Sequence, residues 1–194
     1  MQNKIVSGEV IELEQNSVSL LGPNLELLNC SVVSRTAAKG ISLRGLNMAG
    51  GTFTQQVRLS DFHFHNAHFQ NVKFRGEFWG CDFGDWDDQA KSSITNCDFS
   101  DSMMHGCRFL NSDMKSIKLP GWPHFCIFNP ADAREFVLET NWPGDLDVTL
   151  DVYTDVDPEC QAIVSNAEIL AADNGILVDD LRRLLEQVPG ISIN

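Results

Sequence analysis

The chain has 194 residues, of which 43% are hydrophobic and 21% are charged, and its formal net charge is −13 at pH 7. This length suits one domain, or one domain with a small addition, and supplies enough apolar side chains for a core. The negative charge disfavours direct binding to the phosphates of DNA or RNA, and the sequence has no run of about 18 apolar residues that would cross a membrane.

The N-terminal residues predict ordinary β-strands. Residues 4–33 alternate apolar and polar side chains, as in IVSGEVIELEQNSVSLLG. We therefore assign residues 1–30 to strands that cap, or lead into, the structure that follows. The opening MQNKIVSGEVIELEQ lacks a basic start followed by an apolar run, so we expect no secretory signal.

A five-residue repeat fills the middle of the chain. Residues 92–121 divide into six consecutive blocks, SSITN-CDFSD-SMMHG-CRFLN-SDMKS-IKLPG. The central residue of each block is large and apolar, and the residue two places before it is small or aliphatic. The six centres are Ile94, Phe99, Met104, Phe109, Met114 and Leu119. A period of five fits neither a helix nor a flat strand. It predicts a solenoid in which each block forms one side of a square coil and about twenty residues close a turn.

The same phase extends towards the N-terminus, with a one-residue insertion and a one-residue deletion. The earlier centres are Leu43, Met48, Phe53, Leu59, Phe64, Phe69, Phe74, Phe78 and Phe83. We expect these side chains and the six later centres to fill the core. Residues 84–91, GDWDDQAK, fall outside the phase, which predicts a loop projecting from the coil.

These blocks resemble the pentapeptide-repeat family, whose consensus is A(D/N)LXX. The nearest matches are CDFSD, CRFLN, CDFGD and AHFQN. The resemblance implies a right-handed quadrilateral β-helix over residues 31–130, with the central and minus-two side chains pointing inward. Because a terminal coil exposes unpaired backbone groups, we expect the non-repeat sequence at each end to act as a cap.

The C-terminal segment, residues 131–194, is acidic and does not follow the repeat. It carries 14 Asp and Glu against 3 Lys and Arg, whereas residues 1–130 carry 13 against 11. A charge step of this size predicts a boundary near Asn129 and Pro130. Solubility alone is the alternative explanation of the acidity.

The pattern of this segment predicts a β-α-α appendage. DLDVTLDVY, residues 145–153, alternates strictly, which predicts a half-buried strand with Asp145, Asp147, Asp151 and Tyr153 on its outer face. Asp157 and Pro158 predict the start of a helix that buries Ile163, Ala167 and Leu170. A second helix is predicted over Asp179–Val188. The expected fold class is thus mainly β, a solenoid with a small acidic α+β appendage.

The sequence offers little catalytic chemistry. It has no GxSxG, HExxH, Walker A or GxGxxG motif, so we expect a protein that is not an enzyme and binds no cofactor. His63, His65 and His68 surround Phe64 at outward positions, and they would share a metal ion only if adjacent sides of the coil turned them together. Solvent-exposed histidines are the preferred interpretation, with no metal site. The six cysteines lack CxxC spacing, and most of them occupy small inward positions, which favours a reducing cytoplasm.

A protein-binding role has more support. The loop places Trp86 beside Asp85, Asp87 and Asp88; such a tryptophan either packs back on the coil or anchors a partner, and both remain open. With the acidic strand, the candidate binding residues are Asp85, Trp86, Asp87, Asp88, Asp145, Asp147, Asp151 and Tyr153. Carboxylates around aromatic anchors suit a basic protein surface.

We therefore expect an immunity-type or inhibitory protein that masks a toxin or a nucleic-acid enzyme. The alternative follows from the resemblance: family members of the quinolone-resistance group resemble duplex DNA and bind DNA gyrase or topoisomerase IV. The nearly neutral solenoid speaks against this alternative, since a DNA mimic needs charge along the rod. A purely structural solenoid is a third interpretation, and the pattern also allows a homodimer.

Overall fold

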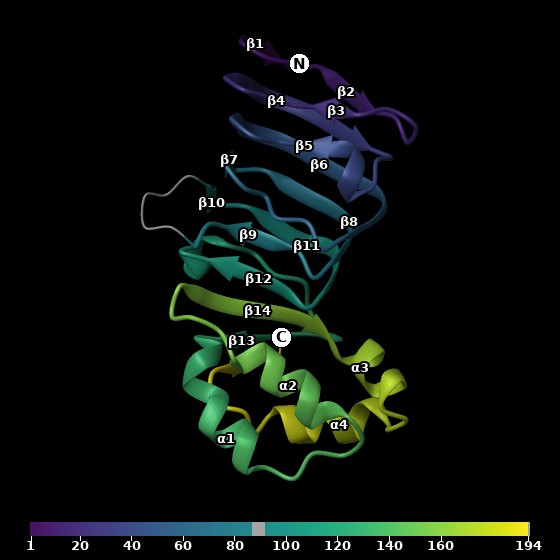
Figure 1. The fold of residues 1–194 in the computed structure, drawn as a ribbon, viewed down its shortest axis with the longest axis vertical. Helices are drawn as coiled ribbons and strands as arrows, with labels where there is room; N and C mark the ends of the chain where they lie inside the picture. The colour runs from purple at the N-terminus through teal and green to yellow at the C-terminus, as the bar shows by residue number, and fades with distance from the viewer. Residues whose placement is uncertain (87–91, 194) are drawn as a thin grey trace.

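The computed structural model describes residues 1–86 and 92–193 and is mainly β, with 44% strand and 21% helix. Stacked parallel strands form a β-solenoid of about 4 turns, and a small helical part lies at its C-terminal end (Figure 1). The solenoid strands are β1 (Lys4–Ser7), β2 (Val10–Leu13), β3 (Ser19–Leu20), β4 (Leu25–Ser34), β5 (Ile41–Ser42), β6 (Leu46–Ser60), β7 (Ala67–Gln70), β8 (Lys73–Trp79), β9 (Asp82–Gly84), β10 (Ser93–Thr95), β11 (Asp98–His105) and β12 (Cys107–Leu110).

The N-terminal strands belong to the same stack as the repeat. β1 and β2 both pair in parallel with β4, and β4 pairs in parallel with β6. Leu25 pairs with Leu46, and Leu46 pairs with Ala67, an offset of 21 residues each time. Residues 4–34 therefore wind as solenoid coil, and the predicted turn of twenty residues is one residue short in these coils.

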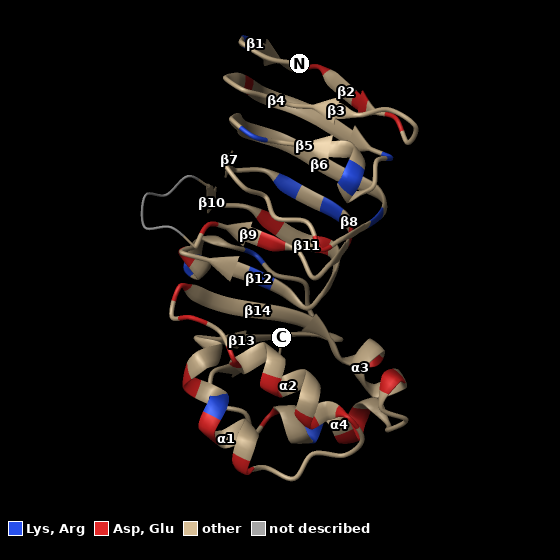
Figure 2. Ribbon diagram, viewed as in Figure 1, with Lys and Arg blue, Asp and Glu red and all other residues tan. Residues whose placement is uncertain are grey.

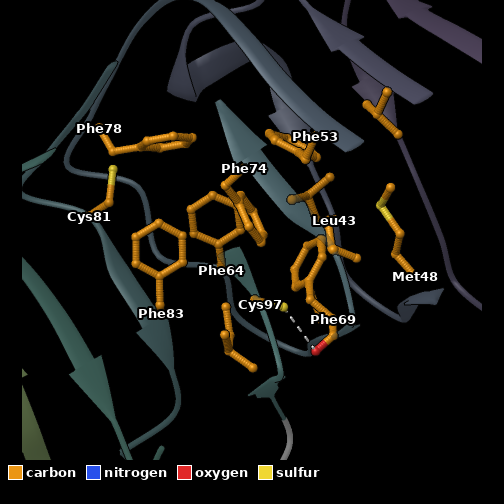
Figure 3. Close-up of a cluster of buried hydrophobic side chains, with 14 of the residues drawn as sticks. Leu43, Met48, Phe53, Phe64, Phe69, Phe74, Phe78, Cys81, Phe83 and Cys97 are labelled. Carbon is orange, nitrogen blue, oxygen red and sulfur yellow. Dashed lines mark hydrogen bonds between the residues drawn. The ribbon is translucent and has the colours of Figure 1, made fainter. Parts of the chain in front are cut away.

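The core is a ladder of phenylalanine rings from successive coils (Figure 3). Phe74 stacks on Phe99 with ring centroids 4.4 Å apart and lies 5.6 Å from Phe53. Phe64 and Phe83 form a second stack, at 4.5 Å. The centres Phe64, Phe69, Phe74, Phe83, Ile94, Phe99, Met104 and Phe109 are buried, whereas Met114 and Leu119 are partly buried. Large apolar rings at every fifth position thus fill the coil interior.

Asparagine and glycine form the corners of the coils. Asn3, Asn24, Gly45 and Asn66 have positive φ angles, between 51° and 76°, and each follows the previous one by 21 residues. Asn and Gly adopt this left-handed conformation at lower cost than other residues. The Asn24 side-chain amide donates a hydrogen bond to Asn3 Oδ1 at 3.0 Å, which links neighbouring corners.

The C-terminal part contains more elements than predicted. They are β13 (His124–Phe128), the 3₁₀ turn η3 (Pro130–Ala133), α1 (Arg134–Glu139), α2 (Leu146–Thr154), β14 (Cys160–Asn166), α3 (Ala167–Asp173), α4 (Val178–Leu185) and β15 (Ile191–Ser192). The predicted helix over Asp179–Val188 is present as α4, within a few residues of the expected bounds.

Two local predictions for this part were wrong. The segment 145–153 is not a strand: helix α2 covers Leu146–Thr154, and Asp145 is its N-cap. The buried side chains Leu146, Leu150 and Tyr153 also satisfy helical spacing, so the alternation did not distinguish the two structures. The helix predicted after Pro158 is strand β14 as far as Asn166, and only Ala167–Asp173 is helical.

β14 joins the solenoid to the helical part. It pairs antiparallel with β12 on one side and with β13 on the other. Ala162 and Val164 pack in the solenoid core, whereas Cys160 and Ile163 pack in a second core beneath the helices. β14 therefore covers the end of the solenoid and forms one wall of the helical part (Figure 1).

None of the helices in the described residues is long and apolar enough to span a membrane.

Candidate functional site

Helices α1 and α2 expose apolar side chains beside carboxylates. Leu138, Val148 and Val152 are 60%, 61% and 64% exposed, respectively. They line a groove of about 320 Å³ together with Asp147 and Asp151 of α2 and with residues 140–142, which follow α1. We call the five residues Leu138, Asp147, Val148, Asp151 and Val152 the α1–α2 face.

The sequence of α2 places apolar residues on two sides of the helix. Leu146 and Leu150 are fully buried, whereas Val148 and Val152 are exposed and lie one turn apart. Core packing explains why Leu146 and Leu150 are apolar, but it does not explain why Val148 and Val152 are. Exposed apolar side chains that gather around a groove are typical of an interaction site.

The α1–α2 face contains two carboxylates, and a cation outside the face pairs with one of them. Arg134 of α1 contacts Asp151 and Asp155, each at 3.0 Å, and so ties α1 to α2. Asp147 and Asp145 are exposed. Figure 2 shows Asp and Glu spread over the helices, in agreement with the excess of carboxylates in residues 131–194. Of the predicted binding residues, Asp147 and Asp151 line the groove.

Tyr153 was wrongly predicted to be an exposed anchor. Its side chain is buried, and its hydroxyl lies 3.0 Å from Ser165 Oγ. Burial raises the pKa of Tyr153 to about 12. Because α2 is a helix, residue 153 lies on the same side as Leu146 and Leu150, towards the core.

The residues that begin the predicted loop contact the solenoid. Asp85 is buried, and its Oδ2 lies 3.1 Å from His65 Nδ1. Trp86 is half-buried and lies against Arg108, whose Cζ is 5.1 Å from the ring centroid. Arg108 in turn forms two hydrogen bonds to Asp82, at 2.6 and 2.8 Å. Trp86 therefore packs back on the protein, against Arg108 of the coil and against the core of the helical part.

The other two acidic residues of the predicted loop, Asp87 and Asp88, lie outside the described residues.

The structure groups the histidines around Phe64 differently from the sequence expectation. One ligand atom from each of His63, His65 and Asp85 lies within 4.8 Å of the other two. His68 is elsewhere on the coil, with Nδ1 2.8 Å from Ser93 Oγ. The sequence could not indicate Asp85 as the third member, because the carboxylate comes from the next coil.

Two further histidines lie in a polar network where the solenoid meets the helical part. His124 Nε2 accepts the Met104 N–H at 3.1 Å, and its Nδ1 lies 3.2 Å from the Gly121 carbonyl oxygen. His105 Nδ1 lies 3.0 Å from Ser165 Oγ. Burial lowers the pKa of both histidines. Ser165 is fully buried, so this serine and histidine pair is part of the packed junction.

The described faces of the solenoid carry paired charges of both signs. Lys73 and Arg75 of β8 lie 2.7 and 3.5 Å from Asp101 of β11. Figure 2 shows these strands with basic and acidic segments next to each other. The coil therefore lacks a continuous anionic stripe in the part that the structure describes.

Fold and site together define a β-solenoid with an acidic helical end piece and an exposed apolar groove. The solenoid is compatible with the pentapeptide-repeat fold. Comparison with protein-family models, with curated proteins and with solved structures gave no significant match.

Proposed function

We propose that this chain is a non-enzymatic binding module whose α1–α2 face captures a protein partner. One observation carries the proposal: Leu138, Val148 and Val152 are mostly exposed along one groove that also holds Asp147 and Asp151. Burying three apolar side chains against a partner would stabilise a complex by several kcal/mol before the entropic cost of association, at about 1.5–3 kcal/mol each.

The acidic surroundings determine the kind of partner. Residues 131–194 carry 14 acidic against 3 basic side chains, and complementary charge favours a partner whose apolar contact is flanked by Lys or Arg. Proteins that act on nucleic acids present such surfaces. We therefore propose an immunity-type or inhibitory protein of the pentapeptide-repeat class that masks a toxin or nucleic-acid enzyme in the cytoplasm. The six buried cysteines, none in a disulfide, support a reducing compartment.

The gyrase-binding alternative receives less support. A DNA mimic requires carboxylates spaced along the rod, whereas Lys73 and Arg75 pair with Asp101 across the coils. The excess of Asp and Glu over Lys and Arg lies in the helical part.

The test compares variants of the α1–α2 face in capture from native host lysate. We expect Asp147→Lys and Val152→Ser each to weaken recovery of one specific protein about tenfold or more, because each changes a side chain that lines the groove. Leu177→Ser is the matched control, since Leu177 is 72% exposed in the same part of the chain but does not line the groove. Equal recovery by wild type and all three variants would rule out the α1–α2 face as the binding surface.

A further inference from the structure

We propose that His63, His65 and Asp85 form a binding site for one divalent transition-metal ion, with Zn²⁺ as the preferred ion. The proposal is independent of the α1–α2 face, because these residues lie on the solenoid coils. It rests on the distances within the cluster, the packing beneath it and the chemistry of its donors.

The three side chains are close enough to share an ion. One ligand atom from each lies within 4.8 Å of the others, and His65 Nδ1 and Asp85 Oδ2 are 3.1 Å apart. Two donors that bind Zn²⁺ at tetrahedral angles lie about 3.3 Å from each other. Small side-chain rotations would therefore bring all three donors to bonding distance.

The fold holds the cluster on a rigid base. His63 and His65 flank Phe64, whose ring stacks on Phe83 of the next coil at 4.5 Å. Phe83 belongs to β9, and Asp85 follows the end of that strand. A parallel bridge between His63 and Asp82 fixes the register of the two coils. Sites supported by packed elements keep their geometry better than sites on loops alone.

Neighbouring groups orient the donors. His63 Nε2 lies 3.0 Å from the Gly84 carbonyl oxygen, which can only accept a hydrogen bond. The proton of the neutral ring is therefore on Nε2, and the lone pair needed by a metal is on Nδ1. A ligand histidine held by a backbone carbonyl is the usual arrangement in metal sites. The Ser92 hydroxyl donates a hydrogen bond to Asp85 Oδ2 at 3.4 Å.

The exposure of the side chains and the types of donor atom favour a metal ion of intermediate softness, such as Zn²⁺, over the hard ions Mg²⁺ and Ca²⁺. The Asp85 side chain is 7% exposed and that of His65 is 37% exposed, so an ion can enter from solvent and contact a carboxylate held inside the coil. Two imidazoles and one carboxylate suit Zn²⁺, Co²⁺ and Ni²⁺, whereas Mg²⁺ and Ca²⁺ prefer oxygen ligands. Three protein donors leave at least one position for water.

Titration of the metal-free full chain with Zn²⁺ against a chromophoric chelator tests the site. We expect one equivalent to bind, and Co²⁺ in its place to give visible d–d absorption. His65→Gln and Asp85→Asn should each weaken binding about 100-fold or more, since losing a ligand exceeds the 10–100-fold effect of losing an outer partner. His68→Gln is the matched control, because His68 is on the same coil and bonds to Ser93 instead.

Thermal unfolding checks that each variant folds. If Asp85→Asn, which changes a buried side chain, fails to fold, His65→Gln alone tests the site. Zn²⁺ should raise the melting temperature of wild type and His68→Gln but not of His65→Gln. No Zn²⁺ binding by wild type below about 100 μM, or equal loss in His65→Gln and His68→Gln, would overturn the proposal. Unchanged binding by His65→Gln would overturn it as well.

Discussion

At the scale of single residues, several inward minus-two positions hold a Cys or Ser whose side chain also donates a hydrogen bond. Cys107 Sγ lies 3.1 Å from the Phe78 carbonyl oxygen, and Cys81 Sγ lies 3.3 Å from that of Leu59. Ser102 makes the same kind of bond, to Phe74 at 3.0 Å. Each of these bonds reaches the preceding coil. The cysteines thus contribute packing and coil-to-coil hydrogen bonds at once.

The phenylalanine ladder gives the clearest prediction at this scale. Phe74 is fully buried and stacks on Phe99 at an angle of 4°. Phe74→Ala should lower the free energy of unfolding by about 3–5 kcal/mol, because it removes the ring and leaves a cavity between two coils. Phe74→Leu should cost clearly less. Urea unfolding measures both, and a loss below about 1 kcal/mol for Phe74→Ala would contradict the ladder as the main source of stability.

At the scale of elements, sequence patterns identified the coil better than they identified the helical part. Five-residue spacing predicted the buried centres from Leu43 to Phe109 because every coil repeats one environment. The environment of helix α2 is not repeated elsewhere in the chain. Its alternating residues fit a strand of period 2, and contacts with the core, which the sequence does not show, determined the outcome.

The segment that forms β14 was wrongly predicted to be helical for a related reason. Its residues are buried on both faces, so its apolar run resembles a buried helix segment. Asp147 nevertheless lies at the surface, as predicted, since both a strand and helix α2 point it away from Leu146. The groove itself could not be predicted, because Leu138 comes from α1 and meets α2 only in the folded chain.

The turn-forming residues at the corners recur with a period of their own. Asn3, Asn24, Gly45 and Asn66 recur every 21 residues, and Gly8, Asn29, Gly50 and Asn71 do the same. This second period, of turn-forming residues, would have placed residues 1–30 inside the solenoid although their apolar repeat is weak.

The junction between solenoid and helical part should be sensitive to acid. Burial lowers the pKa of His105 and His124 below the ordinary value of 6.5, so below about pH 6.5 the unfolded chain takes up protons that the folded chain excludes. Stability from these groups is therefore lost as the pH falls. Protonation of His124 at Nε2 also removes the acceptor for the Met104 N–H.

We expect the urea midpoint of wild type to decrease when the pH is lowered from 7 to 5. The decrease should be smaller in His124→Gln, whose side-chain oxygen still accepts the Met104 N–H without titrating. The same slope in both proteins would show that His124 does not control the acid response.

At the scale of the whole molecule, the helical part acts as the cover of the solenoid. β14 pairs with β12, and Ala162 and Val164 complete the solenoid core. Deleting residues 129–194 should therefore leave the β12 edge unpaired and produce self-associated protein. Size-exclusion chromatography with light scattering measures this. A truncated chain that stays monomeric and keeps the stability of the full chain would show that the solenoid needs no such cover.

The constant 21-residue offset between β4, β6 and β7, with Asn or Gly at each corner, also bears on how the molecule can change over generations. An in-frame duplication of residues 25–45 supplies one complete coil with its own corner, and would lengthen the rod by about 4.8 Å without altering any residue of the acidic end. The length of the rod and the surface of the helical part can thus be inherited as separate traits: duplication adjusts the first, and substitutions on α1 and α2 adjust the second.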